Sequence, residues 1–223
     1  GAGAGAGGGA PAPLSDVGPH AHQLMLTKAV LFALALIPAA HLTYGLLQGT
    51  LGANPAEALQ LGTGIWALRF LVITLAVTPI RRLTTWNGVI QFRRMLGLFA
   101  FFYAVLHLLT YVVLDRYFDV AGIWEDVAKR PFITAGMVAF VAMLPLAITS
   151  TKGWIRRLGR RWQVLHRLIY VSALAAAVHY LWKVKVMWGS PVYYAAIIVV
   201  LLLFRVAWQL KRRSQKHLQP AAS

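Results

Sequence analysis

Six apolar stretches, each roughly as long as the 20 residues needed to cross a bilayer, restrict what this chain can fold into. They cover residues 24–47, 62–80, 95–114, 131–150, 164–182 and 191–210. Hydrophobic residues make up 59% of the chain and its mean hydropathy is +0.63, far above the values of soluble proteins. Inside a bilayer the backbone must satisfy its own hydrogen bonds, which α-helices do. The sequence therefore predicts an all-α fold, a polytopic membrane bundle of six transmembrane helices.

The segments outside these stretches set the domain boundaries. Residues 1–23 begin with a Gly/Ala/Pro-rich run, which we interpret as a tail that is disordered or left over from expression. Residues 24–210 form one six-helix transmembrane domain, and residues 211–223 form a basic tail.

The distribution of basic residues predicts the orientation. The chain has 22 Lys and Arg residues against six Asp and Glu residues, a net charge of +16. Most of these bases lie in the two termini and in the loops that share a membrane side with them, which is the pattern of cytoplasmic segments. We therefore expect a multi-pass protein with both termini in the cytoplasm. Because the bases sit between apolar runs and not on a soluble surface, we expect contact with membrane lipids and no nucleic-acid partner.

Missing residue types exclude several kinds of chemistry. The chain has no cysteine, which excludes disulfides, thiolate metal sites, iron–sulfur clusters and covalently attached haem. No nucleophile–base set, paired carboxylate site or nucleotide-binding motif is visible. The chain is therefore not expected to oxidise NAD(P)H alone, and an electron-transfer role is favoured over that of a catalytic subunit.

Four histidines fall within the predicted spans: His41, His107, His166 and His179. An imidazole in hydrocarbon needs a metal, a hydrogen bond or a cavity to satisfy its nitrogens. At about 1.5 Å per residue, His107 and His179 lie roughly 10 and 5 Å from the outer boundary, so they can face each other across the bundle. His166 lies about 20 Å below His179, close to the inner boundary.

Histidine is a standard axial ligand for haem that is held without thiolate, and a bundle core is a usual place for such a site. The histidines therefore predict bis-histidine haem b, with His107, His179 and His166 as iron ligands and one or two haems bound. Thirteen residues rotate a helix by about 220° beyond three full turns, so His166 and His179 do not share one face of an ideal helix. Depth in the membrane does not make His41 a poorer ligand candidate than His107. For each histidine, the alternative role is a hydrogen bond between helices.

Haem propionates require cations near the membrane boundary. The outer candidates are Arg69, Arg116, Lys183 and Lys185, and the inner ones are Arg93, Arg94 and Arg167; of these we single out Arg69, Arg93 and Arg94. Snorkelling and topology are the alternative roles of these arginines. Arg69 is the most informative of them because it lies about seven residues inside its span, where snorkelling is costly.

Three segments resemble a known family. They are RRMLGLFAFFYAVLHLLTYVVLD at 93–115, RPFITAGMVAFVAMLPLAITST at 130–151, and LGRRWQVLHRLIYVSALAAAVHYLWKVK at 158–185. Together they resemble the haem-binding membrane subunits of bacterial periplasmic methionine-sulfoxide reductase systems, the MsrQ or YedZ family. Wider relatives are the transmembrane domains of ferric reductases and NADPH oxidases, which hold two stacked haems between their third and fifth spans.

The resemblance implies a cytochrome b of the bacterial inner membrane. Such a subunit takes electrons from the quinone pool or a cytoplasmic flavin reductase and passes them to a periplasmic molybdenum-containing methionine-sulfoxide reductase, which repairs oxidised envelope proteins. It also implies FMN, for which the sequence shows no motif. By position, His107 and His179 match the ligands of the outer haem and His166 matches a ligand of the inner one. The oxidase relatives carry a further histidine where this chain has Arg93 and Arg94, and a guanidinium is a poor iron ligand.

Two other functions compete with this one. A ferric-chelate reductase would use the same haem chemistry with a different acceptor. A small non-haem transporter would use the intramembrane histidines and Arg69, although intramembrane acids and an inverted repeat are both missing from the sequence.

Overall fold

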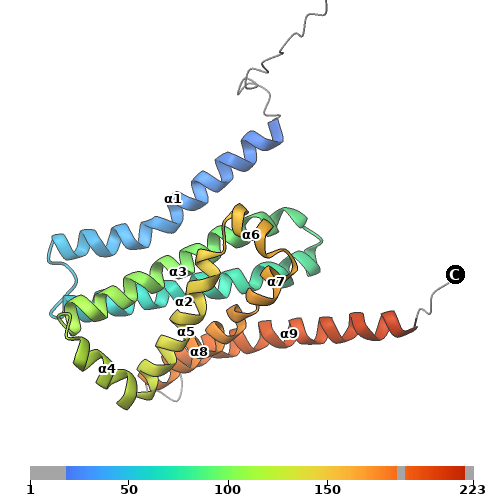
Figure 1. The fold of residues 1–223 in the computed structure, drawn as a ribbon. Helices are drawn as coiled ribbons and strands as arrows, with labels where there is room; N and C mark the ends of the chain where they lie inside the picture. The colour runs from blue at the N-terminus through green and yellow to red at the C-terminus, as the bar shows by residue number, and fades with distance from the viewer. Residues whose placement is uncertain (1–18, 185–188, 219–223) are drawn as a thin grey trace, which may run out of the picture. The chain divides into compact units, whose positions relative to one another are not determined.

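The computed structural model describes residues 19–184 and 189–218, and this part of the chain is helical without strands (Figure 1). Six helical segments are long and apolar enough to cross a membrane: His22–Leu47, Pro55–Thr84, Asn87–Asp115, Pro131–Ile148, Arg160–Val184 and Ser190–Arg212. They coincide with the six predicted stretches, so the predicted all-α, six-span fold is confirmed. Most of the predicted N-terminal tail lies outside the described residues.

The chain divides into two compact units, residues 1–37 and residues 38–223. Helix α1 (Pro19–Leu47) crosses this boundary and contains Pro38 immediately after it. Proline lacks the backbone N–H that a helix interior requires, so the boundary falls where the helical hydrogen bonding is weakest. The described part of the first unit is the first part of α1, and all other elements belong to the second unit.

Helices α2 (Pro55–Thr84) and α3 (Arg93–Thr110) form the first packed pair of the second unit. The short 3₁₀ helix η2 (Asn87–Phe92) connects them, and α3 continues as a π-helix, η3 (Tyr111–Asp115). Phe70 of α2 stacks on Phe99 and Tyr103 of α3, with ring centroids 5.5 and 5.4 Å away. This buried aromatic cluster fixes the α2–α3 register, because large rings tolerate little displacement.

Helices α5 (Pro131–Ile148) and α8 (Leu168–Val184) form the second pair, and α8 also packs against α9 (Ser190–Leu218). Small side chains meet at the α5–α8 interface, where the buried Ala139 of α5 lies against Ser172 of α8. Ser172 is also buried and donates its hydroxyl to the Ala139 carbonyl at 2.9 Å. Small residues let membrane helices approach closely, and this approach brings α5 beside α8 at the site described below.

The fifth span differs from the single helix that its composition predicts. It consists of α7 (Arg160–Leu165), a turn at His166 and Arg167, and α8. A second short helix, α6 (Lys152–Leu158), precedes α7, and Gly159 between them has a φ of +49°. That backbone conformation suits glycine, because L side chains clash there. His166 and His179 thus share one span, as predicted, but His166 lies in a turn at the start of α8 and not within a continuous helix.

A short helix, α4 (Val120–Lys129), lies between the third and fourth spans and is fastened by the buried side chain of Asp126. Asp126 accepts hydrogen bonds from Tyr111 Oη at 2.6 Å and from Arg116, and forms a salt bridge with Arg130 Nε at 3.1 Å. Burial favours the neutral carboxyl, but the hydrogen bonds from Tyr111 and Arg116 and the nearby positive charges outweigh it. The pKa of Asp126 is therefore lowered.

Replacing Asp126 with asparagine is expected to destabilise the protein by about 1–3 kcal/mol, because charge-assisted hydrogen bonds to a buried group are lost. Because the pKa of Asp126 is lower in the folded protein, its carboxylate contributes its full stabilisation at pH values above the unfolded-state pKa of about 3.9. This stabilisation is lost as the pH falls through the folded-state pKa. Thermal denaturation of the purified protein should therefore show a smaller acid-induced drop in Tm below about pH 4 for Asp126→Asn than for wild type.

The matched control is Glu125→Gln on the same helix. The Glu125–Lys129 pair is 2.5 Å long but both side chains are largely exposed. Its loss should cost only about 0.5 kcal/mol. Equal destabilisation by the two substitutions would contradict an anchoring role for Asp126.

Candidate functional site

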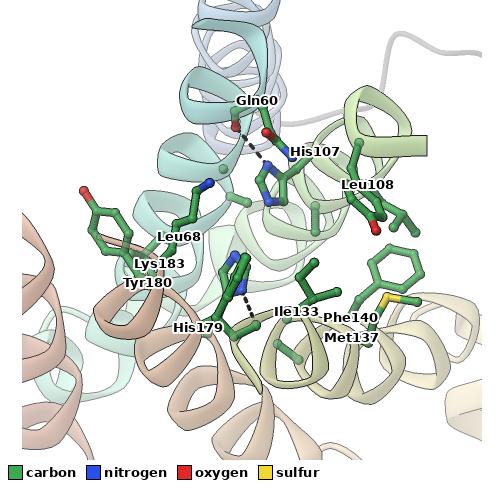
Figure 2. Close-up of a pocket in the computed structure, with 18 of the residues that line it drawn as sticks. Gln60, Leu68, His107, Leu108, Ile133, Met137, Phe140, His179, Tyr180 and Lys183 are labelled. Carbon is green, nitrogen blue, oxygen red and sulfur yellow. Dashed lines mark hydrogen bonds between the residues drawn. The ribbon is translucent and has the colours of Figure 1, made fainter. Parts of the chain in front are cut away.

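His107 of α3 and His179 of α8 project toward one another from the two packed helix pairs (Figure 2). Their ring centroids are 5.9 Å apart and the ring planes are inclined by 75°. Metal–imidazole bonds are about 2.0–2.1 Å long, so two bonds to a shared metal would take up about 4 Å of this separation. The rest of the distance lies within the rings, between each centroid and its nitrogen. The two rings are therefore spaced to share one metal centre.

Each imidazole is held through its Nδ1 atom by a backbone carbonyl. His107 Nδ1–H donates to the Gln60 carbonyl of α2 at 2.9 Å, and His179 Nδ1–H donates to the Phe132 carbonyl of α5 at 2.6 Å (Figure 2). A carbonyl oxygen only accepts, so the proton must lie on Nδ1 in both rings. In the neutral rings Nε2 then carries the lone pair, and a hydrogen bond of this kind typically orients a histidine that ligates a metal.

A glycine lies four residues after each accepting carbonyl: Gly64 follows Gln60, and Gly136 follows Phe132. A Cβ atom on Gly64 would lie 3.0 Å from His107 Cε1 and Nδ1, and one on Gly136 would lie 2.8 Å from His179 Nδ1. In a helix, the residue at i+4 covers the carbonyl of residue i, so glycine there gives the imidazole access to that carbonyl. Sequence analysis missed both glycines; the only available signal was an isolated glycine in a helix, which normally costs stability.

The two histidines line a cavity of about 460 Å³ between α2, α3, α5 and α8. Most of its wall is apolar, as with Leu68, Phe140 and Met143. Two cations, Arg130 and Lys183, also line it. Among the described residues no group of three or more His, Asp or Glu side chains could hold a metal ion. Two imidazoles facing each other across an apolar cavity would be able to hold a haem iron, and the two cations would pair with its propionates.

The structure does not bring Arg69 into this cavity. Arg69 Nε donates to Tyr194 Oη of α9 at 3.0 Å, and its guanidinium lies 4.6 Å from the centroid of the Trp66 ring. Its position inside the span is therefore explained by contacts between α2 and α9. His41 is exposed and does not line the cavity either.

The other predicted residues lie at the opposite end of the bundle. His166 stacks on Trp162, with ring centroids 3.8 Å apart, and donates Nδ1–H to the Trp162 carbonyl at 3.1 Å. Its Nε2 atom is buried and has no hydrogen-bond partner among the described residues. Arg93, at the start of α3, lies within electrostatic range of His166, whereas Arg94 is exposed.

Comparison with known proteins first defines the class. The family model described as "Ferric reductase like transmembrane component" matches residues 63–177, which include His107 and end two residues before His179. The chain therefore belongs to a class of membrane proteins with a ferric reductase-like transmembrane domain. No solved structure matches the chain significantly.

Curated relatives define the particular family. Proteins named "Protein-methionine-sulfoxide reductase heme-binding subunit MsrQ" are 50% identical in Herminiimonas arsenicoxydans (89% of this chain, 93% of the relative) and 51% identical in Azospira oryzae (86% and 84%). The one from Xanthomonas euvesicatoria is 48% identical, over 83% of this chain and 88% of the relative. The chain belongs to the MsrQ family, as its sequence motifs predicted.

Replacing Gly64 or Gly136 with alanine is expected to destabilise the protein by about 1–3 kcal/mol, because the new methyl group overlaps a histidine ring in a packed site. The same substitution elsewhere in a helix interior stabilises by about 1 kcal/mol. Thermal denaturation should therefore show a lower Tm for both variants.

Gly97→Ala on α3 is the matched control, since its Cβ would meet only Thr74 Cγ2 at 3.5 Å, an ordinary contact. A Tm that rises equally in all three variants would show that the glycines do not make room for the imidazoles.

Proposed function

We propose that this protein is a haem b electron-transfer subunit in which His107 and His179 would hold the haem iron. The observation that carries the proposal is the opposed pair of imidazoles, 5.9 Å apart and both held in the Nδ1–H tautomer. The printed name of the relatives, a heme-binding subunit of a methionine-sulfoxide reductase, supports the same cofactor. When bound, haem would supply reversible one-electron chemistry.

The residues of the chain have separate roles in this proposal. The Gln60 and Phe132 carbonyls orient the imidazoles and raise their basicity. The mostly apolar wall would limit the water at the site, so the charges there would come mainly from the protein. Arg130 and Lys183 place positive charge at the cavity, where they would balance propionates.

The proposed electron path runs across the bacterial inner membrane. Electrons would enter from the quinone pool or a cytoplasmic flavin reductase and leave to a periplasmic, molybdenum-containing methionine-sulfoxide reductase that repairs oxidised proteins. With both termini cytoplasmic, His107 and His179 would lie toward the periplasm, on the side of the acceptor. FMN is a further proposed cofactor of this system, on the ground of the family resemblance.

Haem binding should depend on the two opposed histidines. His107→Ala and His179→Ala are each expected to remove the haem that absorbs with a reducible Soret band and a sharp α band, because each loses an axial ligand. Reduced-minus-oxidised spectra and the haem-to-protein ratio of purified protein provide the measurement. His41→Ala, an exposed histidine of another span, is the control and should keep the wild-type spectrum.

The haem-to-protein ratio also tests His166. A second haem there would give about two haems per chain, with one lost in His166→Ala. A correctly folded but colourless wild-type protein would reject the haem assignment altogether.

The acceptor distinguishes the proposed function from that of a ferric-chelate reductase, which the name of the matching family model favours. Reduced protein should be reoxidised on mixing with the periplasmic methionine-sulfoxide reductase subunit, followed at the α band in a stopped-flow spectrometer. Reoxidation by ferric citrate alone would favour the ferric-chelate alternative. The transporter hypothesis relied on Arg69 as a charge inside the membrane, whereas Arg69 contacts Tyr194 and Trp66.

A further inference from the structure

The end of the bundle opposite the His107–His179 cavity holds a cluster of cations that we call the arginine cluster: Arg82 of α2, Arg93 of α3 and Arg205 of α9. Arg205 is 5% exposed. Its Nη1 donates to Tyr170 Oη at 2.9 Å and its Nη2 donates to the Leu75 carbonyl at 2.7 Å. Arg205 thereby connects α9 to both α8 and α2.

The Leu75 carbonyl is available to Arg205 for a local reason. In a helix this oxygen would accept from the N–H of residue 79, but residue 79 is proline and has no N–H. Arg205 satisfies that carbonyl and gains one neutral acceptor. These two neutral partners leave its charge without a counter-ion, and an uncompensated buried charge is costly.

The charges around Arg205 increase this cost. Arg205 lies within electrostatic range of both Arg82 and Arg93. The Arg82 guanidinium lies 5.0 Å from the centroid of the Trp208 ring of α9. The described acids, Glu57, Asp115, Asp119, Glu125 and Asp126, all belong to segments at the His107–His179 end. Among the described residues, no carboxylate forms a salt bridge with the arginine cluster.

Hydrogen-bond donors in the cluster are also left over. Arg82 Nη1 and Arg205 Nε are both buried, and neither has a hydrogen-bond partner among the described residues. Arg82 and Arg93 are only partly buried, so the cluster reaches the surface of the bundle. Neighbouring guanidinium groups with free donors and no carboxylate partner are the arrangement that binds an anion.

We propose that the arginine cluster binds a phosphoryl group presented at this face of the bundle. A phosphoryl group carries one or two negative charges and several acceptor oxygens, so it can neutralise the cluster and accept from both free donors at once. Two sources carry this chemistry here: the headgroup of an anionic phospholipid and the phosphate of FMN. The proposal does not depend on haem at His107 and His179, because the two sites lie at opposite ends of the bundle.

The test uses the full chain, purified with its haem and placed in nanodiscs. FMN binding is measured by quenching of flavin fluorescence, with riboflavin, which lacks the phosphate, as the comparison ligand. Retention of phosphatidylglycerol against phosphatidylcholine is measured by native mass spectrometry. The variants are Arg82→Gln and Arg93→Gln, with Arg161→Gln as the control, because Arg161 is an exposed arginine of α7 at the same end.

We expect Arg82→Gln and Arg93→Gln each to weaken one of these two ligands about tenfold or more, as expected for loss of a charged hydrogen bond, and Arg161→Gln to leave it unchanged. FMN binding that riboflavin does not reproduce identifies the flavin phosphate as the source. Selective loss of phosphatidylglycerol identifies the lipid headgroup. Arg205→Lys, which retains the charge with fewer donors, should weaken the same ligand if it folds.

Two results would overturn the proposal. If neither ligand binds more tightly to wild type than to the Arg82 and Arg93 variants, the cluster only holds helices together. If these variants instead lose one equivalent of haem while both phosphoryl ligands remain unaffected, the occupant is a haem carboxylate.

Discussion

A neutral imidazole inside a membrane domain has two nitrogens to satisfy, and this constraint determines how the helices around the site are arranged. In both His107 and His179 one nitrogen is satisfied by a backbone carbonyl of a neighbouring helix, so the other remains available. The carbonyl is reached only where the next turn of that helix presents glycine. Each histidine therefore requires a partner helix at close range, α2 for His107 and α5 for His179.

The two helix pairs meet this requirement in different ways. The α2–α3 pair is fixed by a stack of aromatic rings around Phe70, and the α5–α8 pair by small residues and the Ser172 hydrogen bond to Ala139. Large rings set the register, whereas small residues set a short distance between helix axes. Each pair delivers one imidazole, and the cavity forms where the pairs face one another (Figure 2).

Much of the fold could be predicted from the sequence because the bilayer allows few alternatives for long apolar stretches. Helix depth alone placed His107 and His179 at similar levels, and they do face each other. The misplaced features depend on one tertiary contact and on one local backbone feature. Arg69 contacts Tyr194, which is 125 positions away in the chain, and the helix break at His166 reflects local hydrogen bonding that hydropathy does not encode.

Using backbone atoms to hold the imidazoles has a consequence for how the family can diverge. The two hydrogen bonds that orient the rings come from the backbone at positions 60 and 132, so they do not depend on which side chains stand there as long as the helices keep their course. The constraint falls instead on the small residue one turn later, whose contribution is the volume it leaves empty. In distant homologues the site should be traceable through a histidine on one helix and a glycine on its neighbour, even where the residue supplying the acceptor has changed beyond recognition.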